Sequence, residues 1–517
     1  MHKFRFLISI VTLALFSACG GGGGTKCDSC LSSNEPVKGS VSGTVVDKSG
    51  APVSGVTISL YYGNVHTTVT TTTDANGAYT VTGLDTSNTS TDQPDYQIFA
   101  EKGGVAFYPS STATGGVGKV VKLDYNGYYR TVIRFNPPPP RTVTGANFTA
   151  YKSGDKVASL PKTGQTTSYA SGDDGSAQRG VAWPGTRFTD NSNGTITDQL
   201  TGLVWVKNAG CFSPTNWASA LTAANQLASG ACGLADGSTA GQWRMPNANE
   251  LESLVDVSRN NPAVSAASPF SKISLTSAYW SSTTYMALSS NALAIRFSDG
   301  RWINGIDAGD GSFNNNKSTS SNLLLAVKSG GVGAVQPLAT GVFFSNTGGG
   351  GGASFGPKDD ASLQMGAVLT SPRFIDNGNG TLSDTVTGLT WLKKANCISD
   401  TWANSLTTIN NLASGQCGLN DGSSAGQWRM PNRSEMLSLS DRAPTFNQSD
   451  YFNGQAQGSF GPVTGPVIFN TFITSNNYWT STTYAADITQ AWTIWSCDFG
   501  VYNIAKTNVQ YSLAVRG

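Results

Sequence analysis

The chain has 517 residues, of which 38% are hydrophobic and 13% charged, and its 33 basic residues nearly balance its 32 acidic ones. This length predicts three or four domains, and the composition excludes a disordered chain, which would combine low hydrophobicity with high net charge. The near-neutral charge also argues against nucleic acid as a partner, because phosphate binding requires clustered Lys and Arg.

Residues 1–18 have the pattern of an export signal. Lys3 and Arg5 precede an apolar run, residues 6–16, that is too short to span a bilayer. The following FSAC resembles the lipobox of bacterial lipoproteins, with Phe16 where Leu is usual. The resemblance implies cleavage before Cys19 and a lipid on that cysteine; the alternative is an ordinary secretory signal. The glycine after Cys19 resembles an outer-membrane sorting choice, so we expect a lipid anchor in the bacterial outer membrane, on its surface or periplasmic face.

A flexible tether follows at 19–39. It contains five consecutive glycines, which favour a mobile spacer, and a C-x-x-C pair formed by Cys27 and Cys30. This pair could be redox-active, but it lies in a Gly-rich tail rather than at a strand–helix turn, so its role stays open. No later stretch is apolar for 18 residues, and we expect no second membrane segment.

Residues 40–135 predict a small all-β sandwich. Short alternating runs are separated by turn residues, as in VSGTVVD, VTISLYY and YQIFAEK. The opening SGTVVDKSGAPVSGVTISL and the later TTDANGAYTVTGL, with Asp74, Gly77 and Tyr79, resemble the carboxypeptidase regulatory-like domain. The resemblance implies a transthyretin- or immunoglobulin-like sandwich that acts as a stalk. Four prolines from Pro137 then favour a stiff linker over 136–159.

The remainder of the chain is a tandem duplication, with one copy at 160–330 and a linker plus the second copy at 331–517. Residues 173–211 align with 359–397 without a gap, with 20 of 39 positions identical. Residues 227–247 align with 412–432 with 18 of 21 identical. Such similarity predicts that each copy folds as its own domain.

Within one copy the pattern predicts an α+β fold. RFTDNSNGTITD is typical of a β-hairpin with its turn at Asn193-Gly194, which explains it better than a calcium loop does. Residues 215–228 favour a helix, and the repeated GQWRMPN opens a second helix that Asn247 and Glu250 can close with a capping box. We therefore assign this block a structural role. The acid pairs Asp173-Asp174 and Asp359-Asp360 are interpreted as solvated loop acids.

The cysteines fit an oxidising compartment. Cys211 and Cys232 recur as Cys397 and Cys417, so we expect each of these pairs to form a disulfide. Cys497 is left over; it could be a free thiol, a partner for another chain, or a buried residue. Neither copy contains histidine, so a Ser-His-Asp or Cys-His arrangement is excluded there, and we predict no metal, no cofactor and no enzyme activity.

The repeated motifs resemble one known family. F-x-D-N-x-N-G-T, TGLxW, GQWRMPN-x-x-E, YW[ST]ST and the closing AV[KR] are similar to the Lcl C-terminal domain, named after the end domain of a bacterial collagen-like adhesin that binds host glycans. WR-x-P-N-x-x-E and YWSS also resemble elements of the sulfatase-modifying-factor family. That weaker likeness implies a C-type-lectin-like fold for each copy.

The copies diverge after YW[ST]STTY, and we predict that this segment binds ligand. It is rich in Trp, Tyr and Asn, which stack on sugars or anchor protein contacts. The competing interpretation is that its alternating apolar residues belong to the core of a strand. The candidate residues are Trp492, Trp495, Tyr502 and Asn503, with Trp302 and Asn304 in the first copy.

These features together predict a lipid-anchored envelope or surface protein that binds a glycan or protein ligand in adhesion or attachment. One alternative is a structural envelope protein that partners another membrane component. Another is an enzyme related to the sulfatase-modifying factors, which the missing catalytic groups disfavour.

Overall fold

The computed structural model describes most of the chain from residue 38 onward. Residues 1–37, with the predicted export signal, Cys19, Cys27 and Cys30, lie outside the described part, as do Pro137 to Pro140 and Asn304. The described residues are 38–47, 50–62, 65–85, 96–102, 105–109, 116–122, 129–135, 142–144, 147–151, 157–285, 288–303, 315–342, 358–367, 373–440, 442, 457–458, 461–462, 469, 472–473 and 475–517.

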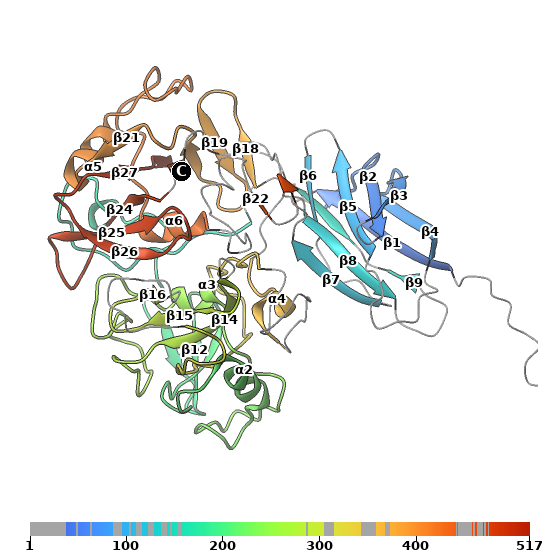
Figure 1. Ribbon diagram of the computed structural model, residues 1–517, viewed down its shortest axis with the longest axis horizontal. Helices are drawn as coiled ribbons and strands as arrows, with labels where there is room; N and C mark the ends of the chain where they lie inside the picture. Colours follow the sequence, from blue (N-terminus) through green and yellow to red (C-terminus); the bar gives the residue numbers. More distant parts are fainter. Residues whose placement is uncertain are drawn as a thin grey trace, which may run out of the picture.

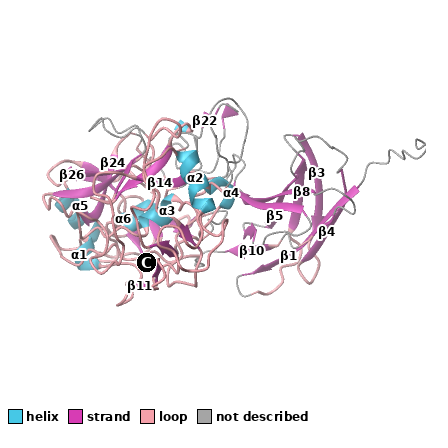
Figure 2. Ribbon diagram, turned by 90° about the horizontal axis from the view of Figure 1, so that it is seen from below, coloured by secondary structure: helices cyan, strands magenta, loops and turns pink. Residues whose placement is uncertain are grey.

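The N-terminal domain consists of strands, as predicted, and contains none of the described helices (Figures 1 and 2). Buried aliphatic side chains such as Val41, Val45 and Ile58 form its core. The strands pair in the order β3-β2-β5-β6-β10-β1-β4, with β8 beside β5 and β7, and β9 beside β1. Their bounds are β1 (Lys38–Asp47), β2 (Thr57–Tyr62), β3 (Val65–Thr72), β4 (Ala78–Asp85), β5 (Tyr96–Lys102), β6 (Val105–Pro109), β7 (Gly116–Lys122), β8 (Tyr129–Phe135), β9 (Thr142–Val143) and β10 (Phe148–Tyr151).

The DANGAY motif makes the turn that leads into β4. The Asp74 carboxylate accepts hydrogen bonds from the backbone N–H groups of Asn76 and Ala78, both at 2.8 Å. Gly77 has φ +69°, and a Cβ there would lie 2.3 Å from the Val45 carbonyl oxygen. The motif therefore needs its glycine because the turn packs against β1.

The sandwich extends beyond the predicted boundary at residue 135. β9 pairs in parallel with β1, and β10 inserts between β1 and β6. These residues fall in the segment predicted as the 136–159 linker, which corrects that boundary. The Pro-rich stretch gave a connector signal, whereas the short strands after it carried too weak an alternating pattern to be recognised.

Each repeat contains two main sheets and two helices, and the second adds the two-stranded sheet β22-β23, so the molecule is mostly β with few helices. In the first copy the sheets run β11-β12-β13-β17 and β14-β15-β16; in the second they run β18-β19-β20-β28 and β21-β27-β24-β25-β26. The first copy comprises β11 (Phe188–Asp190), β12 (Thr195–Asp198), β13 (Val204–Val206), α2 (Trp217–Gln226), α3 (Ala248–Glu252), β14 (Tyr279–Thr284), β15 (Ala292–Arg296), β16 (Arg301–Ile303) and β17 (Val327–Lys328). The second comprises β18 (Phe374–Asp376), β19 (Thr381–Asp384), β20 (Thr390–Leu392), β21 (Ile398–Asp400), α5 (Trp402–Asn410), α6 (Arg433–Ser438), β22 (Gln457–Gly458), β23 (Gly461–Pro462), β24 (Asn477–Thr483), β25 (Gln490–Trp495), β26 (Val501–Ala505), β27 (Gln510–Ser512) and β28 (Val515–Arg516).

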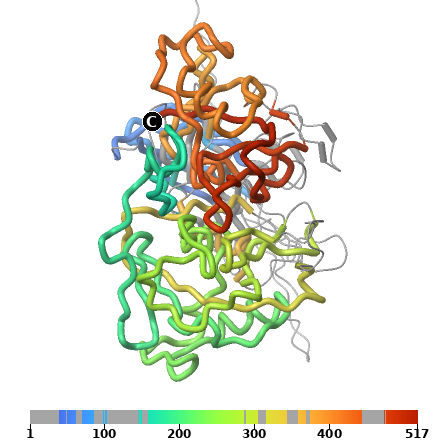
Figure 3. Tube along the Cα trace, turned by 90° about the vertical axis from the view of Figure 1, so that its left-hand side faces the viewer, coloured from blue at the N-terminus to red at the C-terminus, as the bar shows by residue number. Residues whose placement is uncertain are grey.

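The segment that precedes each repeat crosses to the opposite repeat. Arm 1, residues 157–186, contains α1 (Asp174–Ala177) and packs against β24 of the second copy. Arm 2, the described residues 335–342 and 358–367, contains α4 (Asp360–Leu363) and packs against β14 of the first copy. Figure 3 shows arm 1, in teal, running beside the second copy before the chain enters the first. The sequence assigned residues 160–186 to the first domain, and the structure corrects this.

The two repeats also share one hydrophobic core. A continuous cluster of buried residues includes Tyr279 and Ile295 from the first copy together with Tyr478 and Ile494 from the second. A separate cluster in each copy surrounds its longer helix, α2 or α5. The expectation of two independent domains is therefore replaced by one joined pair (Figure 1). Among the described residues, no helix has the length and apolar character needed to cross a membrane.

Candidate functional site

The repeated GQWRMPN block has the structural role that the sequence predicts. Trp243 is fully buried, and Asn247 and Glu250 form a capping box at the start of α3. Arg244 donates two hydrogen bonds of 2.6 Å to the Glu250 carboxylate, so this buried charge is paired. The second copy repeats the arrangement with Arg429, Asn432 and Glu435. The block is a scaffold and supplies no free chemical group.

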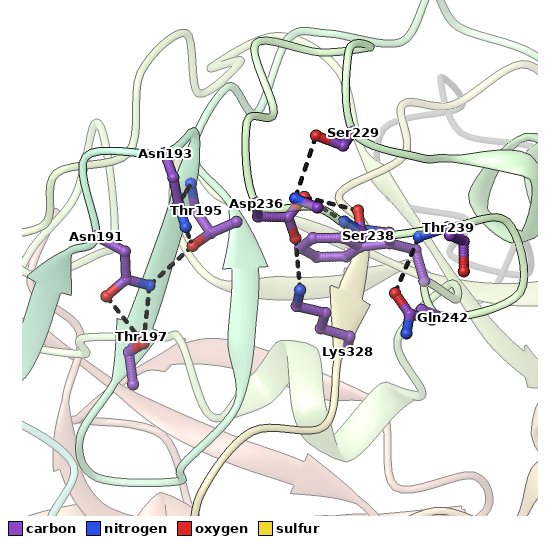
Figure 4. Close-up of polar contacts among 12 residues, drawn as sticks. Asn191, Asn193, Thr195, Thr197, Ser229, Asp236, Ser238, Thr239, Gln242 and Lys328 are labelled. Carbon is purple, nitrogen blue, oxygen red and sulfur yellow. Dashed lines mark hydrogen bonds and ion pairs between the residues drawn. The ribbon is translucent and has the colours of Figure 1, made fainter.

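An exposed loop in each copy is held by local polar contacts (Figure 4). The Asp236 carboxylate accepts from Ser238 at 2.7 Å and pairs with Lys328, while Gln242 accepts from the backbone of Thr239 at 2.9 Å. On the neighbouring hairpin, Asn191 donates to two threonine hydroxyls, at 2.8 and 2.9 Å. Equivalent contacts occur in the second copy, with Ser383 in place of Thr197 and Arg516 in place of Lys328. Because the polar groups satisfy one another, the identity of this loop between copies has a structural explanation.

Two disulfides close these loops as predicted. Cys211 pairs with Cys232, and Cys397 with Cys417. Cys497 is a free, partly exposed thiol whose sulfur lies 3.3 Å from the Ser475 hydroxyl.

The divergent segment forms the edge of each copy's sheet, as β15–β16 and β25–β26, and its two faces differ. Trp492 pairs with Asn503, and Thr493 with Tyr502. Because side chains alternate along a strand, Trp492 and Asn503 share one face, while Thr493, Trp495 and Tyr502 share the other. The candidate residues are thus divided between two environments.

The face with Trp492 lies at the contact between the repeats, in the hydrophobic cluster that both share, although the arginine over Trp492 comes from its own repeat. Trp492 is 1% exposed and lies beneath the Arg433 guanidinium, at 4.5 Å from the ring centroid. Trp302 is 4% exposed, donates to Glu252 at 2.7 Å and lies beneath Arg442 of the other copy. These two tryptophans therefore belong to the contact between repeats, and their burial argues against the predicted role in ligand binding.

Asn503 also belongs to this contact. Its amide oxygen accepts from Arg301 of the first copy and its amide nitrogen donates to Gln490. Arg433 bridges the copies as well, because it donates to Glu252 at 3.0 Å and to the carbonyl of Gly300. The sequence did not single out Arg433; the signal would have been a charged residue at the position of Ala248, directly after the seven identical residues GQWRMPN.

The opposite face of β25–β26 is partly open at one end. Trp495 and Tyr502 are half-buried there. The half-buried Asn477 of β24 is the cross-strand partner of Trp495 and lies on the same face. Thr493 lies between them, fully buried, and donates to the Asn477 amide oxygen at 3.0 Å. We call Trp495, Tyr502 and Asn477 the open patch. It places two aromatic rings and an amide on one surface, with Thr493 fixing the amide.

The first copy has no equivalent patch. By strand register, Arg296 occupies the position in the first copy that Trp495 occupies in the second, and Ile303 occupies that of Tyr502. Arg296 pairs with Asp299 at 2.6 Å, and Ile303 is buried. Asn477 was missed by the sequence reasoning, although its replacement of Ala278 directly before the repeated YW[ST]ST motif marks it.

The acid pairs interpreted as solvated are in fact buried. Asp173 and Asp359 are N-caps of α1 and α4, and each accepts from a serine N–H three residues later. Asp174 and Asp360 are 2% exposed. Burial raises the pKa of Asp174 to about 6 and that of Asp360 to about 7. The correction follows from the arms, because docking on the opposite repeat covers residues that look like loop acids in the sequence.

A lysine in each copy lies beside the docked arm. Lys317 donates to Thr284 at 2.8 Å and lies 4.4 Å from the Trp217 ring centroid; Lys506 donates to Thr483 at 2.8 Å and lies 3.9 Å from Trp402. Burial lowers the pKa of both amines to about 8. The described residues contain no group of three His, Cys, Asp or Glu side chains that could hold a metal ion.

Sequence comparison places the repeats in a family. Residues 194–320 and 380–516, just over half of the chain, match the Lcl C-terminal domain. The chain belongs to the Lcl C-terminal domain family. Both matches begin after the exchanged arms, so they correspond to the bodies of the two Lcl C-terminal repeats. Residues 40–104 match the carboxypeptidase regulatory-like domain, which confirms the predicted N-terminal module. No curated protein matches the chain.

Solved structures give no further information on the Lcl C-terminal repeats. A 3-chlorocatechol 1,2-dioxygenase from Rhodococcus opacus is 12% identical over 22% of this chain and 58% of its own length, with a TM-score of 0.14. The dioxygenase domain of a dioxygenase carbohydrate-binding protein fusion from Streptomyces is 16% identical over 23% of this chain and 82% of its own length, also with a TM-score of 0.14. Bacterial invasin, an integrin-binding protein, is 11% identical over 92% of this chain and 95% of its own length, with a TM-score of 0.13. TM-scores this low carry no argument, and the chain spans little more than half of the first structure.

Proposed function

We propose that this protein is a non-catalytic recognition protein of the bacterial envelope that binds a glycan or protein ligand through the open patch of its second repeat. The observation that carries the proposal is the shared surface of Trp495, Tyr502 and Asn477. Aromatic rings with one accessible face stack on sugar rings or anchor protein contacts, and an amide supplies hydrogen bonds that give direction.

The rest of the chain would present this patch to its ligand. A lipid on Cys19 would anchor the protein in the outer membrane, and the Gly-rich tether and β-sandwich would carry the repeats away from the bilayer. A C-type-lectin-like assignment for the repeats belongs to this proposal. Adhesion or attachment is the use that such an arrangement would serve.

A glycan is the preferred ligand because the open patch carries no charged side chain. Binding would depend on stacking and on hydrogen bonds from Asn477, rather than on ionic contacts. The alternative, a structural envelope protein that partners another membrane component, would use the same anchor without any glycan.

A binding assay on a broad glycan panel tests the proposal. The soluble protein, residues 31–517, is compared with Trp495→Ala and Tyr502→Ala. Each substitution removes a stacking ring, so we expect the affinity for a selected glycan to fall by about tenfold or more. Tyr169→Ala is the matched control, because Tyr169 is an aromatic residue of arm 1 with 40% of its surface exposed.

The outcomes distinguish the two functions. Loss of binding in folded Trp495→Ala and Tyr502→Ala, with Tyr169→Ala unchanged, supports glycan recognition at the open patch. Equal binding by all variants overturns the assignment of the site. If the protein binds no glycan on the panel, the structural alternative is favoured. Proteins that co-purify with the anchored form would then identify its partner.

A further inference from the structure

The exchanged arms are held by contacts that cross between repeats. In arm 1, Asp174 accepts a hydrogen bond of 2.7 Å from Thr482 of the second repeat. Gln165 exchanges two hydrogen bonds of 3.0 Å with the backbone of Thr483, and Asn432 donates to the arm carbonyl of Arg179 at 3.2 Å. Arm 1 therefore docks on the second repeat although the chain enters the first repeat directly after it.

Arm 2 repeats this docking in the other direction. Asp360 accepts a hydrogen bond of 2.7 Å from Thr283 of the first repeat. Asn247 donates to the arm carbonyl of Met365 at 2.8 Å, and Asn249 donates to that of Leu338 at 2.8 Å. The same carboxylate–threonine contact is thus built twice, at equivalent positions of α1 and α4.

The two docking carboxylates are buried without a hydrogen bond from a cation. Among the described residues, the donors to Asp174 are the hydroxyls of Thr163 and Thr482, and the donors to Asp360 are those of Thr340 and Thr283. One oxygen of Asp360 has no hydrogen-bond partner. A charged carboxylate in such surroundings is unfavourable, whereas a protonated one keeps an acceptor oxygen for the threonine.

Both acids and cations lie around these carboxylates. Asp174 faces Asp173 on its own arm and Glu435 on α6; Asp360 faces Asp359 on its arm and Glu250 on α3. Both glutamates are already paired with arginines. The nearby cations are Lys506, which faces Asp173, Lys317, which faces Asp359, and Arg442, which faces Asp360.

We propose that Asp174 and Asp360 are proton-operated latches, each of which locks an exchanged arm onto the opposite repeat at mildly acidic pH and loosens it as the pH rises. Arm 1 leads from the β-sandwich into the repeats, so its latch also controls how rigidly the pair of repeats is held on the sandwich. The two latches act separately, because they lie on different arms and contact different repeats.

The direction follows from linkage. The raised pKa values, about 6 for Asp174 and about 7 for Asp360, lie above the unfolded value of 3.8. A docked arm therefore binds a proton more tightly than a released arm does, and docking is strongest below the unfolded pKa. This stabilisation of the docked arm is lost as the pH rises through the pKa of the docked carboxyl, first for Asp174 in arm 1 and then for Asp360 in arm 2.

Hydrogen exchange of the full-length protein in detergent tests the latches. Exchange of arm peptides is measured at pH 5 and pH 8, corrected for the intrinsic pH dependence of amide exchange, with the hairpin β11–β12 as an internal reference. We expect protection to fall by about tenfold in arm 1 and by up to about a hundredfold in arm 2, as the two pKa values require.

Three variants separate the latches from general loosening. Asp174→Asn cannot ionise, so it should abolish the pH dependence of arm 1 and leave that of arm 2 intact; Asp360→Asn should do the reverse. Thr482→Val removes the cross-repeat donor and should weaken arm 1 at both pH values. Equal pH dependence in the wild type and in both Asn variants would overturn the proposal, as would arms whose protection does not change with pH.

Discussion

The two Lcl C-terminal repeats differ most where they face each other. The second repeat places Arg433 and Trp492 where the first has Ala248 and Leu293, while the first places Trp302 where the second has Val501. The result is an asymmetric contact. Arg442 of the second repeat covers Trp302 of the first, and Arg433, which lies over Trp492 of its own repeat, pairs with Glu252 of the first. After duplication, each face was therefore free to specialise for its partner.

The residues that stayed identical satisfy needs within one repeat. The capping box, the Arg–Glu pair beside it and the disulfide-closed loop use the same contacts in both copies. The comparison teaches that identity between copies marks local structural requirements and the docking of the arms, which both repeats share. Divergence marks the contact between copies and the open patch.

Breaking the asymmetric contact should give the largest effect on stability. Arg433→Ala leaves Glu252 without its cation and removes the stacking on Trp492, so we expect a loss of about 3 kcal/mol in the free energy of unfolding. Chemical denaturation measures it. Arg259→Ala, at an exposed position, is the control and should change little.

Removing the charge of Glu252, the partner of Arg433, tests whether the ion pair is responsible for this loss. Glu252→Gln in the Arg433→Ala background should recover part of the loss, because the unpaired carboxylate is then gone. If the double variant is no more stable than Arg433→Ala, the ion pair does not hold the repeats together.

Removing either disulfide should have similar effects in the two repeats. The bonded cysteines are separated by 21 and 20 residues, so each bridge is expected to contribute about 3 kcal/mol by restricting the unfolded chain. Cys211→Ser with Cys232→Ser is compared with Cys397→Ser with Cys417→Ser by thermal unfolding. A large difference between the pairs would show that the scaffolds are not equivalent.

The smallest effect is expected at the helix caps. Asn247→Ala and Asn432→Ala each remove an N-cap acceptor and a hydrogen bond to an exchanged arm, at a cost of about 1–2 kcal/mol. Serine at either position keeps a capping oxygen and should recover part of the loss. Equal destabilisation by Ala and Ser would mean that the arm contact dominates.

Local features of this protein were predictable from its sequence. The α2 helix, the hairpin at Asn193-Gly194, the capping boxes and both disulfides depend on residues close together in the chain or on a repeated motif. Such features follow from backbone geometry and turn chemistry, which neighbouring residues specify directly. The alternation of side chains in the divergent segment also predicts that Trp492 and Trp495 lie on opposite faces of their strand.

Tertiary structure decided which of these residues are accessible. Trp492 and Trp495 are three positions apart in one strand, yet one lies in the contact between repeats and the other lies in the open patch. Asp174 and Asp360 have the local sequence of loop acids, but docking across the repeats buries them. Burial depends on which segment packs on which, and an exchange of arms between near-identical partners leaves no local signal, because either repeat offers the same threonine to either arm.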